Sequence, residues 1–159
     1  MVLFREASVV TVLVVLTLSL ECIGMVALIH WARPKITRGL HRLGPWRSGM
    51  LIVRFTIFIV ILHGLQILLW AWFYRLECFP SWEPALYFSI ANYTTVGAAD
   101  LLLSRTWRVL GAVESGIGIL MCGLSIAFIF AVITRLMERE ARFSPELAWM
   151  TDLSDREHK

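Results

Sequence analysis

The chain has 159 residues, of which 58% are hydrophobic and 17% are charged, and its formal net charge at pH 7 is +3. A soluble domain of this length carries more charge, and the mean hydropathy of +0.70 is high. The apolar residues are also gathered into long blocks, which is typical of an integral membrane protein. The composition therefore excludes an ordinary soluble domain.

Three apolar blocks are long enough to cross roughly 30 Å of hydrocarbon as helices. They run from about Ser8 to Ile29, from about Leu51 to Phe73 and from about Val109 to Leu136. A cleaved signal peptide is the alternative for the first block. Its N-terminal flank has one Arg and one Glu, its apolar stretch is long and no A-x-A cleavage site follows, which favours a retained helix within residues 1–32.

Basic residues indicate the side of the membrane on which each connecting segment lies. The linker at residues 33–50 and the segment after the third block are both rich in Arg, and cytoplasmic segments carry such an excess. We therefore expect the N-terminus outside, the linker inside, the segment from Arg75 to Arg108 outside and the C-terminus in the cytoplasm. Because membrane helices flank the basic stretch at 33–47, we expect it to contact anionic lipid rather than nucleic acid.

Several polar side chains lie inside the apolar blocks, where they are costly and usually face protein. Glu21 is interpreted either as a proton- or cation-responsive site or as an acid that is hydrogen-bonded to a neighbouring helix. His63 is expected to be a neutral packing residue, because no second His or Cys stands at metal-ligand spacing. Arg54 lies close enough to the inner end of its block to extend to the membrane surface.

The three cysteines form no CxxC motif, and their odd number gives no closed disulfide framework. Cys22 and Cys122 are interpreted as small apolar packing residues. Cys78 lies in the outer segment, where a disulfide between subunits is an alternative to a free thiol.

A short helix is predicted between the second and third blocks. Ser81 is a candidate N-cap, and Trp82-Glu83-Pro84 has the composition of a first helical turn. The helix should run to about Tyr93, which is too short to span a bilayer. Such a re-entrant helix is tolerated only where protein surrounds it, and the negative end of its dipole would favour a cation.

The segment directly after this helix reads Thr94-Thr95-Val96-Gly97-Ala98-Ala99-Asp100. It resembles the selectivity filter of tetrameric potassium channels, which reads Thr-Val-Gly-Tyr-Gly-Asp. It departs from that pattern at Ala98 and Ala99, where the family has Tyr and Gly. The resemblance extends over roughly residues 51–136, including the aromatic short helix and the glycine-rich third block. The short loops also make the chain similar to small bacterial potassium channel-like proteins.

The resemblance implies a homotetramer, because one loop cannot form a closed ring of carbonyl ligands around a cation. All seven residues from Thr94 to Asp100 are implied filter residues, and potassium or sodium ions are the implied ligands. The ion-site carbonyls would come from Thr95, Val96 and Gly97. The implied support residues, which would hold the outer acid Asp100 or pack behind the loop, are Tyr87, Trp107 and Glu114.

The two departures predict a changed outer half of the filter. Ala99 replaces a glycine whose left-handed backbone angles cost an L-residue roughly 1 kcal/mol or more. Ala98 removes a Tyr that braces the loop. We therefore expect an outer half that is wider, rebuilt or collapsed, and weak discrimination between sodium and potassium.

The third block carries a row of small residues and one acidic residue, Glu114. The small residues either line an inner cavity, with a glycine as a gating hinge, or form a close helix–helix contact; they are Gly118, Gly123, Ala127 and Ala131. Glu114 either reaches the back of the filter or pairs with Arg105 or Arg108.

The sequence thus predicts an all-α membrane protein with three transmembrane helices and a re-entrant pore helix and loop. The pore domain is expected over 51–136 and a short cytoplasmic tail over 137–159. The expected function is that of a cation channel subunit in a bacterial inner membrane, and a non-conducting, channel-derived scaffold or regulatory subunit is the alternative. No catalytic motif is present, and neither an enzymatic activity nor an organic cofactor is expected.

Overall fold

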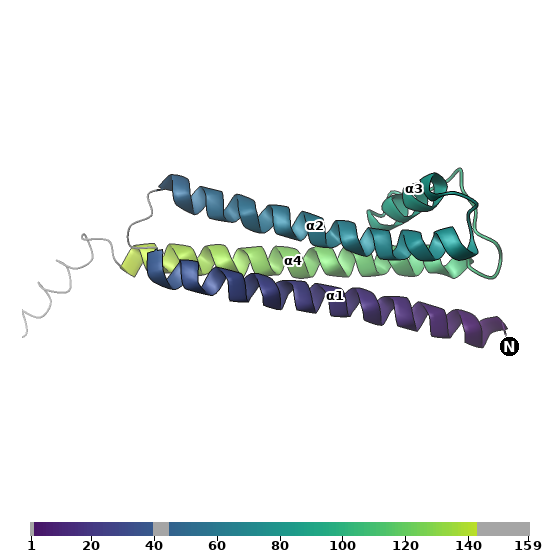
Figure 1. Ribbon diagram of the computed structural model, residues 1–159, viewed down its shortest axis with the longest axis horizontal. Coiled ribbons are helices and arrows are strands. Elements are labelled where there is room, and N and C mark those ends of the chain that lie inside the picture. Colours follow the sequence, from purple (N-terminus) through teal and green to yellow (C-terminus); the bar gives the residue numbers. More distant parts are fainter. Residues whose placement is uncertain (1, 40–44, 143–159) are drawn as a thin grey trace, which may run out of the picture. The chain divides into compact units, whose positions relative to one another are not determined.

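The computed structural model describes residues 2–39 and 45–142, with side chains for 4–31 and 49–135. The regular structure of these residues is entirely helical (Figure 1): α1 is Val2–Gly39, α2 is Pro45–Glu77, α3 is Trp82–Tyr93 and α4 is Arg108–Arg142. The chain forms two compact units, Met1–Ser125 and Ile126–Lys159, and α4 passes from one into the other. The predicted all-α fold class is confirmed.

Three of the helices contain segments that are long and apolar enough to cross a membrane. These segments are Phe4–Trp31 in α1, Gly49–Glu77 in α2 and Arg108–Arg135 in α4. Each includes nearly all of one predicted apolar block, so the expectation of three membrane helices is confirmed.

The helices extend further than the predicted blocks. The expected linker at 33–50 is largely helical, because α1 continues to Gly39 and α2 begins at Pro45. The side chains of the basic stretch at 33–47 lie outside the described residues, as does the predicted tail from residue 143 onward.

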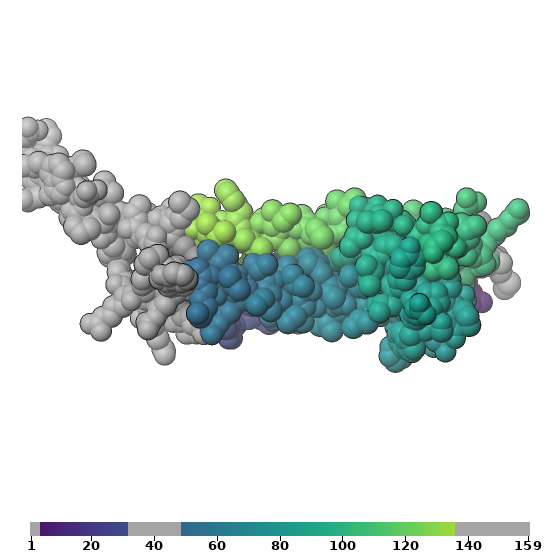
Figure 2. Space-filling model, turned by 90° about the horizontal axis from the view of Figure 1, so that it is seen from above, coloured from purple at the N-terminus to yellow at the C-terminus, as the bar shows by residue number. Residues whose placement is uncertain are grey.

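Helix α3 has the predicted bounds and is attached to one end of α2. Figure 2 shows α3 and the loops beside it gathered at that end. Ser81 occupies the N-cap position with extended backbone angles (φ −140°, ψ 167°), but its side chain makes no capping hydrogen bond. The prediction of a side-chain cap at Ser81 is therefore wrong, whereas the helix start is right.

An aromatic core covers one face of α3. Trp70 and Tyr74 from α2 are fully buried, and Phe88 from α3 and Leu110 from α4 pack with them. The rings of Tyr74 and Phe88 meet edge to face at 4.9 Å between centroids, a favourable aromatic geometry. This packing fixes α3, and with it the loop that follows.

The helix faces turned away from this core are apolar and exposed, as lipid or further protein copies would require. Cys22 and Cys122 are exposed as well. Cys122 nevertheless lies close enough to Glu21 and Tyr93 to interact with them electrostatically, and the packing of both cysteines against further copies of the chain stays a prediction. Cys78 is half-buried and free.

Candidate functional site

The loop at residues 94–100 begins as a turn folded back on the end of α3. The backbone amide of Thr95 donates to the carbonyl of Asn92 at 2.8 Å, and that of Gly97 donates to Ala91 at 2.9 Å. The Thr94 hydroxyl donates to the carbonyl of Ile90 at 2.7 Å. Carbonyls at a helix C-terminus lack helical partners, so these bonds use the free end of α3 to hold the loop.

Two loop residues have left-handed backbone angles. Thr95 has φ 65° and Gly97 has φ 78°. Gly97 bears no steric cost, but a β-branched residue such as Thr95 is a clear outlier, which costs roughly 1–2 kcal/mol.

Ala99 is not among the described residues with positive φ, so the single chain does not have the left-handed angles that an alanine resists at this position. The expected change of the outer half in the assembled pore, which is to be wider, rebuilt or collapsed, stays a prediction. The chain turns earlier, at Thr95 and Gly97, and then forms a turn in which the Leu101 amide donates to the carbonyl of Ala98 at 3.4 Å. With no second glycine, the loop avoids left-handed angles at that position and places the strain on Thr95 instead.

Most of the loop's side chains face outward from the single chain. Val96 is 81% exposed, and Ala98 alone is half-buried, packed against the aromatic core. Among the described residues no group of three or more His, Cys, Asp or Glu could hold a metal ion. A cation at this loop would therefore use backbone carbonyl oxygens and the Thr95 hydroxyl.

The outer acid of the loop is held by α3. The Tyr87 hydroxyl donates to Oδ1 of Asp100 at 3.2 Å, which is the contact that the sequence predicted. This hydrogen bond, together with the charge of Asp100, raises the pKa of Tyr87, because ionised Tyr87 would lose the donated proton.

Trp107 is buried and meets Phe73 of α2 at 5.2 Å between ring centroids, so it packs on α2.

Glu114 joins three helices behind the loop. It is fully buried in α4, and its oxygens accept hydrogen bonds from Tyr74 of α2 at 2.8 Å and Ser89 of α3 at 2.5 Å. Glu114 thus contacts α3, the helix that precedes the loop, and the described hydrogen bonds and ion pairs join it neither to the loop itself nor to Arg105 or Arg108. Tyr74 and Ser89 were not predicted as partners, because nothing in their spacing shows which acid they meet.

Small residues let α4 approach the end of α3. A Cβ atom built at Gly118 would lie 2.2 Å from the carbonyl oxygen of Tyr93, so Gly118 is a close helix contact. The Ser115 hydroxyl donates to the carbonyl of Asn92 at 2.8 Å on the same side.

The other small residues of the predicted row have no such contact. A Cβ atom at Gly123 would meet nothing within 4 Å. In the second unit, Ala127 and Ala131 are exposed. Their lining of an inner pore stays a prediction.

A buried polar network connects α1 to the end of α3. Gln66 of α2 donates to Oε2 of Glu21 at 2.7 Å, and Ser125 of α4 donates to Oε1 at 2.9 Å. The Tyr93 hydroxyl donates to Oε1 of Gln66 and lies 2.8 Å from Nδ1 of His63. Glu21 is therefore hydrogen-bonded to neighbouring helices, as one of its two interpretations proposed, and His63 is a hydrogen-bonded packing residue.

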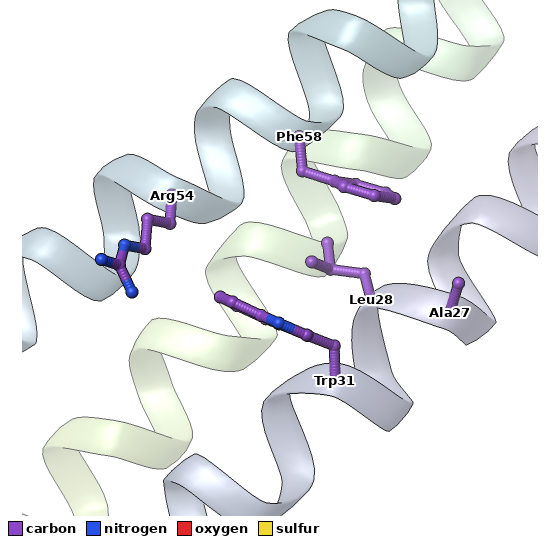
Figure 3. A pocket seen from close by; sticks show the side chains of 5 residues that line it. All are labelled: Ala27, Leu28, Trp31, Arg54 and Phe58. Carbon is purple, nitrogen blue, oxygen red and sulfur yellow. The ribbon is translucent and has the colours of Figure 1, made fainter.

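A cavity of about 370 Å³ lies between α1 and α2, away from the loop. Figure 3 shows Leu28 and Trp31 of α1 facing Phe58 of α2, with Arg54 at one end; Ala27 completes the lining. The cavity is apolar except for the Arg54 side chain, which is exposed.

Comparison with known proteins gives one match. Residues 55–135 match a family model described as ion channel. This segment is just over half of the chain and runs from Phe55 in α2 through α3 and the loop to Arg135 in α4, so that α1 lies outside it. No curated protein and no solved structure matches the chain.

Proposed function

Because the chain belongs to the ion-channel family, we propose that it is a pore-forming subunit that conducts monovalent cations. The observation that carries this proposal is the position of the 94–100 loop. It follows the C-terminal end of α3, where the helix dipole is negative, and Glu114, Tyr74 and Ser89 hold that helix in place. Backbone carbonyls presented there can replace part of the hydration shell of a cation.

The pore is a homotetramer in this proposal. One loop supplies ligands to one side of an ion only, and fourfold repetition closes the ring. The exposure of apolar side chains beside the loop supports this assembly: Val96 is 81% exposed and Leu102 is 86% exposed. Further copies of the chain would cover such groups. Native mass spectrometry with a monomer or dimer as the only stable species would contradict it.

Potassium is permeant in this proposal, and selectivity against sodium is weak. The inner carbonyls come from Thr95, Val96 and Gly97. The outer half lacks the second glycine and the bracing Tyr of the potassium-channel pattern, and it turns differently from that pattern at Ala98 and Ala99. Fewer well-formed carbonyl rings give a cation fewer sites at which size is discriminated.

The proposed topology has the N-terminus outside and the C-terminus in the cytoplasm of a bacterial inner membrane. It rests on the Arg-rich segments identified in the sequence. The ion pair between Arg5 and Glu77, 3.0 Å long, supports an arrangement in which the start of α1 and the end of α2 lie at the same membrane face. Outside labelling should therefore modify a cysteine placed at Ser104 and spare one placed at Ser48.

Anionic lipid is the second proposed partner. The cavity between α1 and α2 would take an acyl chain, and the exposed Arg54 at its end would bind the lipid phosphate. Arg54→Gln should reduce the phosphatidylglycerol retained by the purified protein relative to phosphatidylcholine, measured by native mass spectrometry. Arg105→Gln, in the outer loop, is the matched control. Equal retention in both variants would contradict a lipid site at Arg54.

The non-conducting scaffold is the second candidate function. The loss of both the Tyr and the second Gly of the potassium-channel pattern, at Ala98 and Ala99, favours it, because a filter that no longer conducts would lose such residues. Potassium flux from liposomes that contain the purified protein separates the two candidates. Flux above that of empty liposomes supports the channel, and its absence supports the scaffold.

A further inference from the structure

We propose that α1, which lies outside the segment that matches the ion-channel family, positions the filter loop. In this proposal Glu21 is a positioning residue that acts on Tyr93 through Gln66. The inference rests on the proposed function, because it assigns a role to the loop at 94–100. It extends that function to a helix that the family match does not include.

The first step is that the hydrogen bond between Gln66 and Glu21 is buried. Glu21 and Gln66 are both fully buried, and they meet at 2.7 Å. A polar pair in a membrane helix is retained only where protein surrounds it. Ser125 supplies the second donor to Glu21 at 2.9 Å, so the carboxylate joins α1 to both α2 and α4.

The second step is the direction of the hydrogen bonds. Gln66 uses its amide nitrogen on Glu21 and its amide oxygen on Tyr93, so its two ends are both engaged. The Tyr93 hydroxyl has one proton, which it gives to Gln66. Nδ1 of His63, 2.8 Å away, must then donate to the Tyr93 oxygen. Loss of Glu21 frees Gln66 to turn, and Tyr93 then loses its fixed acceptor.

The third step links Tyr93 to the loop. Tyr93 is the last residue of α3, and its carbonyl oxygen is closely packed on Gly118. Its backbone therefore has little room, and its ring is held by the network. Thr95, two residues later, has a left-handed backbone that is stable only where its surroundings fix it. A Tyr93 side chain that moves more therefore holds the strained backbone of Thr95 less firmly.

Amide hydrogen exchange on the assembled, full-length protein tests this inference without requiring any current. The Thr95 and Gly97 amides donate to carbonyls of α3, so their exchange reports opening of the loop. In Glu21→Ala we expect exchange in the segment 93–101 to be roughly tenfold faster, the ratio that corresponds to the loss of about one net hydrogen bond.

Thr17→Val is the matched control. Thr17 is one turn before Glu21 on α1, is fully buried and accepts a hydrogen bond from Trp70 of α2 at 3.0 Å. It joins the same two helices but has no connection to Tyr93 in the described network. Because Trp70 belongs to the core that fixes α3, we expect Thr17→Val to loosen the packing of α1 on α2 and to accelerate exchange in 93–101 much less than Glu21→Ala does. Equal acceleration in both variants would show that α1 acts only as general packing, and the inference would fail.

A second variant tests the inference even if Glu21→Ala does not fold. Glu21→Leu combined with Gln66→Leu replaces the polar pair by apolar side chains and leaves no unpaired carboxylate. It should keep the fold and still accelerate exchange in 93–101, because Tyr93 has lost its acceptor. Unchanged exchange in this variant would overturn the inference. If the wild-type protein carries no current while the exchange pattern holds, the proposed function fails and the positioning role of α1 stands.

Discussion

Replacing Gly118 by Ala tests the closest helix contact in the structure. The added Cβ would lie 2.2 Å from the Tyr93 carbonyl oxygen, and real Cβ contacts begin above about 3 Å. The obstructing atom belongs to the backbone, so no side-chain rotation relieves the clash and one of the two helices must move by about 1 Å. Overpacking of this kind costs about 1–3 kcal/mol.

Gly116→Ala provides the matched control in the same helix. A Cβ atom at Gly116 meets nothing within 4 Å, and Ala is favoured over Gly in a helix by about 1 kcal/mol. Thermal unfolding of the purified assembly should therefore show Gly118→Ala less stable than wild type and Gly116→Ala as stable or more stable. If both variants unfold at the same temperature, the close packing of α4 on the end of α3 is refuted.

Two further predictions concern the loop and the outer segment. Thr95→Gly relieves the left-handed strain, which offsets the entropic cost of a new glycine, so this variant should be more stable than Val96→Gly by roughly 1 kcal/mol, because φ is not positive at Val96. Equal unfolding temperatures of the two variants would contradict strain at Thr95. Burial and then the nearby charge of Glu77 raise the pKa of the Cys78 thiol to about 11, so alkylation should be slow at pH 7 and rise through pH 10–11. In a background with the other cysteines replaced by Ser, Glu77→Gln should lower that midpoint, and an unchanged midpoint would rule out the charge as a cause.

The sequence was most informative where local chemistry decides the structure. The start of α3 followed from the composition of Ser81–Pro84, and its observed range, Trp82–Tyr93, is as predicted. The contact of Tyr87 with Asp100 also followed, because the family resemblance implied it. The bounds of α1 and α2 were less accurate, since the segment at 33–50 was interpreted as a linker although helix continues through residues 33–39 and 45–50 of it.

Contacts between helices could not be predicted from the sequence. Glu21 and Gln66 are 45 residues apart, and their spacing does not show that they face each other. The same holds for Glu114, whose partners Tyr74 and Ser89 come from two other helices. A polar residue within an apolar block signals that some partner exists, but the packing of the helices decides which one.

The backbone path of the loop could not be predicted from the sequence, and the reason is physical. Ala99 was expected to resist the left-handed angles of the potassium-channel pattern, but the sequence does not show where the chain would turn. A chain without the second glycine can instead turn at Thr95 and Gly97. The cost is then placed on one β-branched residue, and the position of that residue depends on the hydrogen bonds between the loop and α3.

The most direct test of cation conduction is the reversal potential of the purified protein in planar bilayers, with potassium on one side and sodium on the other. We expect a current that reverses near zero, because the outer half of the filter does not discriminate well. Ala98→Tyr combined with Ala99→Gly should shift the reversal potential toward that of a potassium-selective pore. A wild-type protein that already reverses at the potassium-selective potential would contradict the interpretation of the outer filter. The absence of current in both proteins, in bilayers where an intact potassium channel conducts, would contradict the channel itself.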